Sequence, residues 1–334
     1  MLFSPIFLPY LMILILGSVL SISSSSWFGA WVGLELNLMS FIPLISTKLS
    51  SSSSEAALKY FLTQALGSSI IIFSSSIMFS FSNLSLPLIL MAILLKLGSA
   101  PFHFWFPQVM NGLLWPQIII LATIQKLAPM FLISYLLNNP LIENMILLSA
   151  ILSALIGALG GVNQMNLRKI MAYSSINHMA WMLTAISISE NLWILYFIFY
   201  SFISSSVILL FNSIKAYHFS NMFSNLNHSS FLIILTPMTL LSLGGLPPFS
   251  GFIPKWLLIQ MLINENLFFM LFFLLLSALV TLFFYLRIFI IFLILLNPSF
   301  KWSHKSPYFK NHFTSFLIFG NMFGLLLPTL FMTF

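Results

Sequence analysis

The chain has 334 residues, of which only 5% are charged and 60% are hydrophobic, and its mean hydropathy is +1.07. A soluble domain carries roughly 25% charged residues, so this chain lacks the polar side chains to cover a water-facing surface. The composition excludes a soluble globular enzyme and leaves no polar stretch long enough for a nucleotide, flavin or iron–sulfur domain. The net charge of +7 indicates an asymmetry between loops rather than a nucleic-acid partner.

Taken in chain order, the apolar runs predict an all-α membrane protein with about eleven spanning helices. They cover residues 3–21, 27–45, 56–79, 84–106, 113–137, 141–160, 170–188, 192–214, 231–263, 267–296 and 313–332. Ser52 and Glu55 have the spacing of a capping box at the start of the third run. The ninth run is too long for one straight span and contains LGGLPPFSGFIP, so it is either one interrupted helix or two short ones.

The distribution of charge decides between these two readings of the ninth run. If that run crosses once, basic residues of the loops all fall on the N-terminal side: Lys48, Lys59, Arg168, Lys169, Lys215, Lys301, Lys305 and Lys310. The opposite loops contain Glu143, Glu190 and Glu265 and no lysine or arginine. The positive-inside rule therefore predicts a single interrupted span, an N-terminus on the positive side and a C-terminus opposite.

Two segments of the chain resemble each other. Residues 97–107 read LGSAPFHFWFP and residues 243–254 read LGGLPPFSGFIP, and both follow one pattern if a single inserted proline is allowed. Five spans separate them, so their directions are opposite, which predicts inverted repeats over residues 1–137 and 141–296 with residues 313–332 as an extra helix. Proline and glycine interrupt a helix, and a lone break is often only a kink. A matched pair of breaks is typical of a transport site.

Ionisable side chains lie inside the predicted spans, where a charge costs about 2.5–3.5 kcal/mol. Lys96 precedes the first break, Lys255 follows the second, and Lys126 lies midway along the fifth span, while Glu35 and His178 are central in the second and seventh. Lys126 has too many apolar neighbours on either side to reach the membrane surface. These residues are therefore candidates for a function, and the alternative for a histidine is a satisfied core residue.

A buried amine that is poised between its charged and neutral forms can carry protons. Desolvation disfavours a charged lysine and a nearby carboxylate favours it. Glu35 is the only acid deep in the membrane, and Lys96 is its first-choice partner. If Glu35 moves away, the Lys96 proton is expelled, and Lys126, His178 and Lys255 could relay it through water. Such a path needs no metal and no organic cofactor, and aspartate and cysteine are absent from the chain.

Several segments in order, among them WVGLELNLMSFIPL, LLKLGSAPFHFWFP, QKLAPM, MAYSSINHMAWM and LSLGGLPPFSGFIPKW, resemble the antiporter-like membrane subunits of respiratory complex I. The resemblance covers residues 27–287. It implies eleven helices, and it places the functional residues of this family on Glu35, Lys96, Lys126, Lys255, His178 and His103.

The same resemblance implies a partner set and a location. The chain would lie in the mitochondrial inner membrane with its N-terminus in the matrix and its C-terminus on the intermembrane side. Its neighbours would be other membrane-arm subunits, chiefly subunits 4 and 4L, with accessory subunits and lipids. NADH, FMN, iron–sulfur clusters and ubiquinone would be used by other subunits, and none would reside in this chain. The implied function is proton translocation coupled to electron transfer from NADH to ubiquinone.

Two other function classes compete with a proton-translocating subunit. A free-standing cation/proton antiporter would carry several carboxylates in the membrane for a cation that prefers oxygen ligands, but only Glu35 is deep here. A scaffold needed only for assembly predicts that Lys126→Met leaves proton pumping unchanged.

Overall fold

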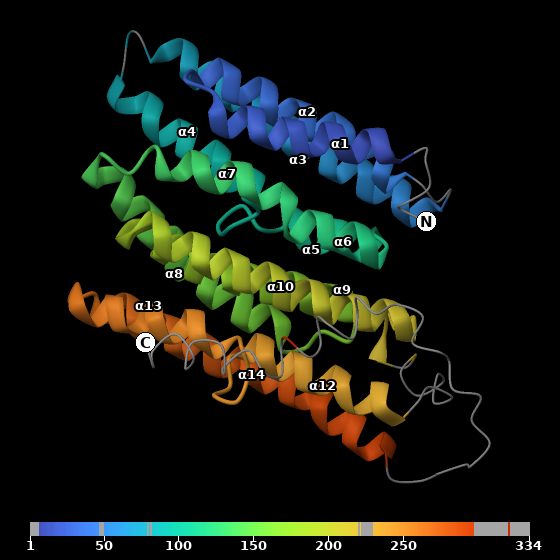
Figure 1. Cartoon of the computed structure of the whole chain (residues 1–334). Coiled ribbons are helices and arrows are strands. Elements are labelled where there is room, and N and C mark those ends of the chain that lie inside the picture. Colours follow the sequence, from blue (N-terminus) through green and yellow to red (C-terminus); the bar gives the residue numbers. More distant parts are fainter. Residues whose placement is uncertain are drawn as a thin grey trace. The chain divides into compact units, whose positions relative to one another are not determined.

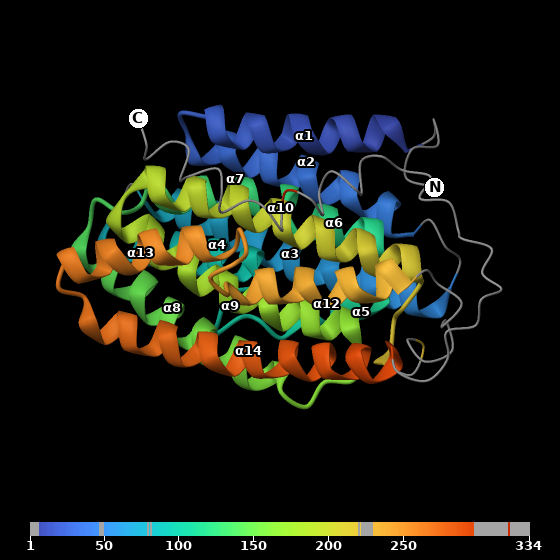
Figure 2. The ribbon, with the colours of Figure 1, turned by 60° about the horizontal axis from the view of Figure 1, so that its bottom comes forward.

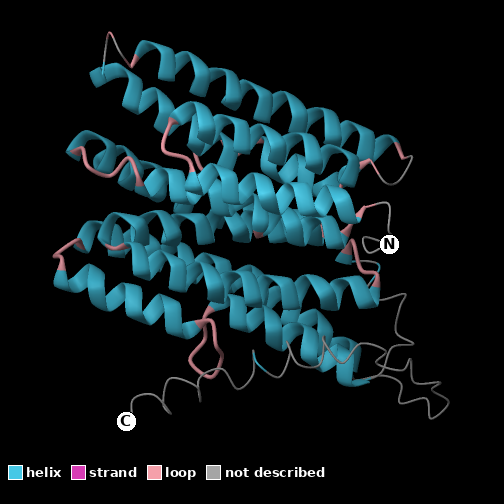
Figure 3. Cartoon of the chain, turned by 45° about the horizontal axis from the view of Figure 1, so that its top comes forward, coloured by secondary structure: helices cyan, strands magenta, loops and turns pink. Residues whose placement is uncertain are grey.

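A computed structural model describes residues 7–46, 50–78, 80, 82–219, 221, 230–296 and 320. Helices make up nearly all of this part of the chain, and no strand forms within it (Figure 3). The expected all-helical membrane architecture is confirmed at this level. The predicted span 313–332 and the basic residues Lys48, Lys301, Lys305 and Lys310 lie outside the described residues.

The chain divides into two compact units, Met1–Ser153 and Ala154–Phe334. The helices of the first unit are α1 (Leu8–Ser23), α2 (Trp27–Ile45), α3 (Ser51–Ile77), α4 (Ser82–Leu97), α5 (Trp105–Gly112), α6 (Trp115–Ala122) and α7 (Ile124–Ser134). Helix α8 (Pro140–Gly161) crosses the division. The helices of the second unit are α9 (Leu167–Ile188), α10 (Glu190–Ile214), α12 (Ser230–Gly244), α13 (Phe252–Asn264) and α14 (Phe268–Leu296).

Within the part of the chain that the structure describes, six segments are long and apolar enough to cross a membrane. They are Trp27–Ile45, Ser51–Ile77, Trp115–Ser134, Pro140–Gly161, Glu190–Ile214 and Phe268–Ile291. Large apolar side chains also cover their outer faces, with Phe269 68% exposed on α14 and Leu66 59% exposed on α3. A protein in water rarely shows so much apolar surface, whereas acyl chains solvate it.

Polar side chains of the loops start several of these helices. Ser26, Ser50 and Asn166 each accept a hydrogen bond from the first turn of α2, α3 and α9. The capping box predicted at Ser52 and Glu55 is therefore wrong, because the helix begins two residues earlier with Ser50 as its cap. Glu55 instead pairs with Lys59, one turn along, at 2.5 Å.

In the first unit, α1, α2 and α3 pack side by side, and α4 and α7 pack against each other (Figure 1). Small residues permit close contact between α1 and α2, because a Cβ atom on Gly17 would lie 2.9 Å from the Gly33 carbonyl. In the second unit, α14 runs along both α12 and α13, and α10 contacts α9, α12 and α13 (Figure 2). Each unit therefore holds an interrupted helix among continuous ones, α4–α5 in the first unit and α12–α13 in the second, and the first unit has a further short break between α6 and α7.

Candidate functional site

The first interruption separates α4 from α5, as the proline-containing motif predicted. Gly98 ends α4 with a φ of 72°, and the amides of Gly98 and Ser99 return to the carbonyls of Leu95 and Leu94. This is a Schellman motif, which requires the left-handed conformation that glycine adopts without strain. The indole of Trp105 and the amide of Gln64 donate to the carbonyls of Leu95 and Lys96. The break therefore leaves these backbone groups satisfied inside the protein.

The second interruption, between α12 and α13, is built in the same way. Gly245 has a φ of 79°, and its amide donates to the Ser242 carbonyl while the Leu246 amide donates to Leu241. The Lys255 amine reaches back across the break and donates to the Gly244 carbonyl at 2.8 Å. A cation at this position also interacts favourably with the C-terminal end of the helix.

The two glycines with positive φ define how the repeated segments correspond. When Gly98 is matched with Gly245, Pro101 meets Pro248 and Pro107 meets Pro254 with no gap. The inserted proline allowed in the sequence comparison is therefore unnecessary. The dipeptide LG occurs in both segments and matches Gly98 to Gly244. The backbone conformation shows that Gly98 corresponds to Gly245, one position later.

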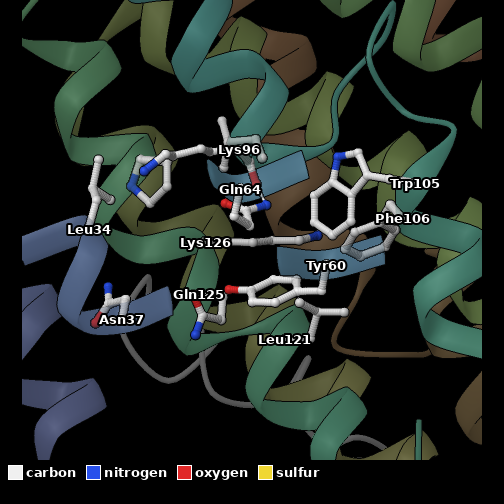
Figure 4. A pocket seen from close by; sticks show the side chains of 12 residues that line it. Leu34, Asn37, Tyr60, Gln64, Lys96, Trp105, Phe106, Leu121, Gln125 and Lys126 are labelled. Carbon is white, nitrogen blue, oxygen red and sulfur yellow. Dashed lines mark hydrogen bonds between the residues drawn. The ribbon is translucent and has the colours of Figure 1, made fainter. Parts of the chain in front are cut away.

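Lys96 and Lys126 line one buried cavity in the first unit (Figure 4). The centre of a water molecule can occupy a volume of about 20 Å³ in this cavity, which is enough space for about one water. Lys96 is 6% exposed and Lys126 is 2% exposed. The Lys126 side chain extends to the Phe106 ring, with its amine 5.3 Å from the ring centroid, while the Lys96 side chain extends toward Leu34. The structure thus brings together two of the predicted site residues.

Glu35 lies on α2 next to this cavity and acts electrostatically on both Lys96 and Tyr60. Within the described part of the chain, Glu35 and Lys96 do not form a salt bridge at contact distance. One oxygen of Glu35 is buried without a hydrogen-bond partner, as are the Asn37 Oδ1 and Gln125 Nε2 atoms. Buried polar atoms are rarely left unpaired, and Asn37 and Gln125 both line the cavity. The cavity therefore offers an acceptor and a donor to a small hydrogen-bonding molecule.

Sequence reasoning missed the polar residues that complete this site. The Tyr60 hydroxyl donates to Gln125 at 3.3 Å, and Gln64 supports the Lys96 carbonyl. Their signal was present in the sequence, since Asn37, Gln64 and Gln125 are carboxamides inside apolar spans. A buried carboxamide requires partners in the same way as a buried charge.

Gly67 of α3 makes room for the carbon chain of Lys96. A Cβ atom at this position would lie 2.9 Å from Lys96 Cγ and 3.2 Å from Cε. We expect Gly67→Ala to preserve folding, because alanine favours the helix by about 1 kcal/mol, but to displace Lys96. An activity that depends on the Lys96 amine should fall by up to about tenfold, since small displacements of a reacting group are costly.

The comparison for this substitution is Gly29→Ala on α2, where the nearest atoms belong to Ser24 and Ser26 rather than to a buried cation. That variant should keep the full activity of the parent protein. Equal activity of the two variants would contradict a positioning role of Gly67.

His103 lies in the loop between α4 and α5, away from the lining of the cavity. It is 6% exposed, its Nδ1 lies 3.3 Å from the Pro101 carbonyl, and its ring packs 4.1 Å from Phe104. The structure therefore does not bring His103 to Lys96 and Lys126 at the cavity, although it buries all three.

In the second unit, Lys255 and His178 are linked by two aromatic side chains. The Lys255 amine lies 5.6 Å from the centroid of the Trp181 ring, and this ring stacks on Tyr196 at 6.4 Å. The Tyr196 hydroxyl lies 2.9 Å from His178 Nδ1. Lys255 is 7% exposed and His178 is 8% exposed, so both are buried as predicted.

The described residues contain no group of three histidine, aspartate or glutamate side chains that could hold a metal ion. Paired helix interruptions are typical of membrane transport proteins, and both interruptions here have a buried lysine beside them, so the fold and the site indicate a protein of this class.

The family comparison agrees with that class. The family described as "NADH:quinone oxidoreductase/Mrp antiporter, TM" matches residues 24–281, and this chain belongs to it. NADH-ubiquinone oxidoreductase chain 2 of Anopheles gambiae is 47% identical over 325 residues, which are 95% of this chain and 94% of that protein.

Solved structures share the fold at lower identity. A chain of respiratory complex I from Thermus thermophilus with bound aureothin superposes with a TM-score of 0.79 and 23% identity, covering 96% of this chain and 79% of that one. A chain of an archaeal membrane-bound sulfane sulfur reductase superposes with a TM-score of 0.83 and 17% identity, covering 96% of this chain and 73% of that one.

Proposed function

We propose that this chain is a core membrane-arm subunit of mitochondrial NADH:ubiquinone oxidoreductase and translocates protons as NADH reduces ubiquinone. Near-full-length similarity to an insect chain of that name supports the proposal. The hydride and electron transfers belong to other subunits, because this chain has no cysteine and no polar domain to hold a redox centre. We expect it to hold no resident cofactor.

The observation that carries the proposal is the cavity shared by Lys96 and Lys126, with Glu35 beside it. Two buried amines that line a space for water, with one carboxylate on the neighbouring stretch of α2, have the parts of a proton relay. Water in this cavity would accept from Lys126 or Lys96 and reach the unpaired atoms of Asn37 and Gln125. His178 and Lys255 would continue the relay in the second unit, and His103 would serve at the first break.

Electrostatics supplies the coupling in this proposal. While Glu35 is ionised and close, it favours the charged form of Lys96. When Glu35 is neutralised or displaced, Lys96 loses that support in a desolvated site and transfers its proton to water, which passes it to a neutral Lys126. The proton count is conserved at each step, and no group other than water is required.

The finer arrangement is part of the same proposal. Eleven spans would form two inverted repeats, residues 1–137 and 141–296, within one polytopic membrane domain of residues 1–334, with residues 313–332 as a further helix. The positive loops would face the matrix together with the N-terminus, and the C-terminus would face the intermembrane space. Subunits 4 and 4L, accessory subunits and lipids would cover the outer faces.

Glu35→Gln tests the relay directly, because it removes the charge and keeps the shape. We expect the complex to assemble and its coupled turnover to fall several-fold, since the support for a charged Lys96 is lost. The control is Glu55→Gln, which removes an exposed carboxylate that pairs with Lys59 at the start of α3. Exposed ion pairs contribute about 0–1 kcal/mol, so the control should match the parent protein.

The alternative functions predict different results in the same preparations. A scaffold would leave proton-to-electron stoichiometry unchanged in normally assembled Glu35→Gln complex. A free-standing antiporter would be purified from the native membrane alone rather than within a large assembly. Either result would overturn the proposal.

A further inference from the structure

A buried tyrosine holds the histidine of the second unit. The Tyr196 hydroxyl of α10 lies 2.9 Å from His178 Nδ1 of α9, and Tyr196 is only 2% exposed. The indole of Trp181 stacks on the Tyr196 ring with an interplanar angle of 10°, which fixes the ring. The position of this hydroxyl is therefore set by packing from two helices.

A hydroxyl suits both protonation states of an imidazole. When Nδ1 of His178 carries no proton, the Tyr196 hydroxyl donates a hydrogen bond to that nitrogen. When Nδ1 carries a proton, Nδ1 donates a hydrogen bond to the Tyr196 oxygen. Between these states the hydroxyl hydrogen must turn away from the imidazole. In a water-poor interior that hydrogen requires another acceptor, because a buried unpaired donor is costly.

A second buried hydroxyl lies beside this pair. The Tyr200 ring lies 5.1 Å from the His178 ring, and Tyr200 is only 3% exposed. Tyr200 also follows Tyr196 by four residues on α10, which places the two side chains on the same face of the helix. The Lys255 amine lies beyond the Trp181 ring, and Tyr285 of α14 is a further buried tyrosine that acts electrostatically on Tyr196.

We propose that Tyr196 is a positioning residue that holds His178 in both of its protonation states, with Tyr200 receiving the hydroxyl hydrogen when His178 is protonated. This inference rests on the proposed function, because it requires that His178 changes its protonation during turnover. Tyr196 itself keeps its phenolic proton throughout, and each change moves one proton to or from His178 and rotates one hydroxyl.

Tyr196→Phe in the assembled complex is the test, since it removes the hydroxyl and keeps the ring that stacks on Trp181. Coupled turnover is expected to fall about three- to tenfold, the size of one lost buried hydrogen bond. The pH profile of coupled turnover should also change shape. The matched control is Tyr173→Phe, which removes a hydroxyl from a partly exposed tyrosine on the same helix as His178.

A double-variant cycle separates this role from a structural one. In a His178→Gln background, Tyr196→Phe should cost nothing more, because a residue that acts only through His178 has nothing left to position. If Tyr196→Phe prevents assembly, Tyr200→Phe tests the same role. Tyr200→Phe should cause a smaller loss of turnover, and this loss should disappear in the His178→Gln background. Losses that multiply in either double variant would overturn the inference.

The outcomes also distinguish this inference from the proposed function. If Glu35→Gln and His178→Gln lower pumping while Tyr196→Phe and Tyr173→Phe both match the parent protein, only the role of Tyr196 fails. If none of these substitutions changes proton-to-electron stoichiometry or turnover, the relay itself fails.

Discussion

Lys126→Met is expected to lower the coupled turnover of the assembled complex by at least about tenfold, a modest share of what a positioned acid–base group contributes. The methionine side chain fills nearly the same volume and removes an amine that is only 2% exposed. It also removes the cationic contact with Phe106. Because no charge remains to be solvated, the packing of α7 should tolerate the substitution, and the loss should appear in proton transfer rather than in assembly.

The measurement is NADH-driven proton translocation in vesicles that contain the purified variant complex. Lys59→Met is the control, because Lys59 is a partly exposed lysine whose partner is Glu55 on the same helix. Its proton-to-electron ratio and turnover should match those of the parent complex. A Lys126→Met complex with unchanged pumping would exclude this amine from the proton path.

Gly251→Ala is expected to destabilise the second unit by about 3 kcal/mol or more, and so to lower the yield of assembled complex. A Cβ atom on Gly251 would overlap the backbone carbonyl of Ser242 in α12. That carbonyl already accepts the Gly245 amide in the Schellman motif that ends the helix. Relief of the overlap would therefore shift the break itself, and with it the Gly244 carbonyl that Lys255 binds.

Gly160→Ala provides a contrast with the same added atom. Its nearest neighbour is the ring edge of Tyr173, which is partly exposed and can turn aside. Complex yield and thermal stability should therefore fall much less than in Gly251→Ala. If both variants assembled equally well, backbone crowding at the second break would not limit folding.

Most helices and both breaks could be predicted from the sequence, because apolar runs of membrane length and proline–glycine clusters are strong local signals. The predicted run 27–45 matches α2, and the run 231–263 resolves into α12 and α13 around the expected interruption. The break between α6 and α7 was not predicted. It lies at Thr123, whose hydroxyl donates to the Ile119 carbonyl at 2.7 Å, and threonine gives a much weaker signal than proline.

The candidate site was only partly readable from the sequence. The ionisable residues stood out because charge is rare inside a membrane, and the structure gathers Lys96 and Lys126 at one cavity. Tyr60 and Tyr196 did not stand out, since tyrosine is common in apolar helices and its role depends on which atom its hydroxyl meets. The space that Gly67 leaves for Lys96 is likewise a tertiary property.

Two glycines leave room for the carbon chains of the buried lysines. A Cβ atom on Gly67 would lie 2.9 Å from Lys96 Cγ, and one on Gly245 would lie 2.8 Å from Lys255 Cδ. Each lysine chain therefore passes directly over backbone. The space open to it is set by the main chain of the facing segment and not by side chains that could turn aside.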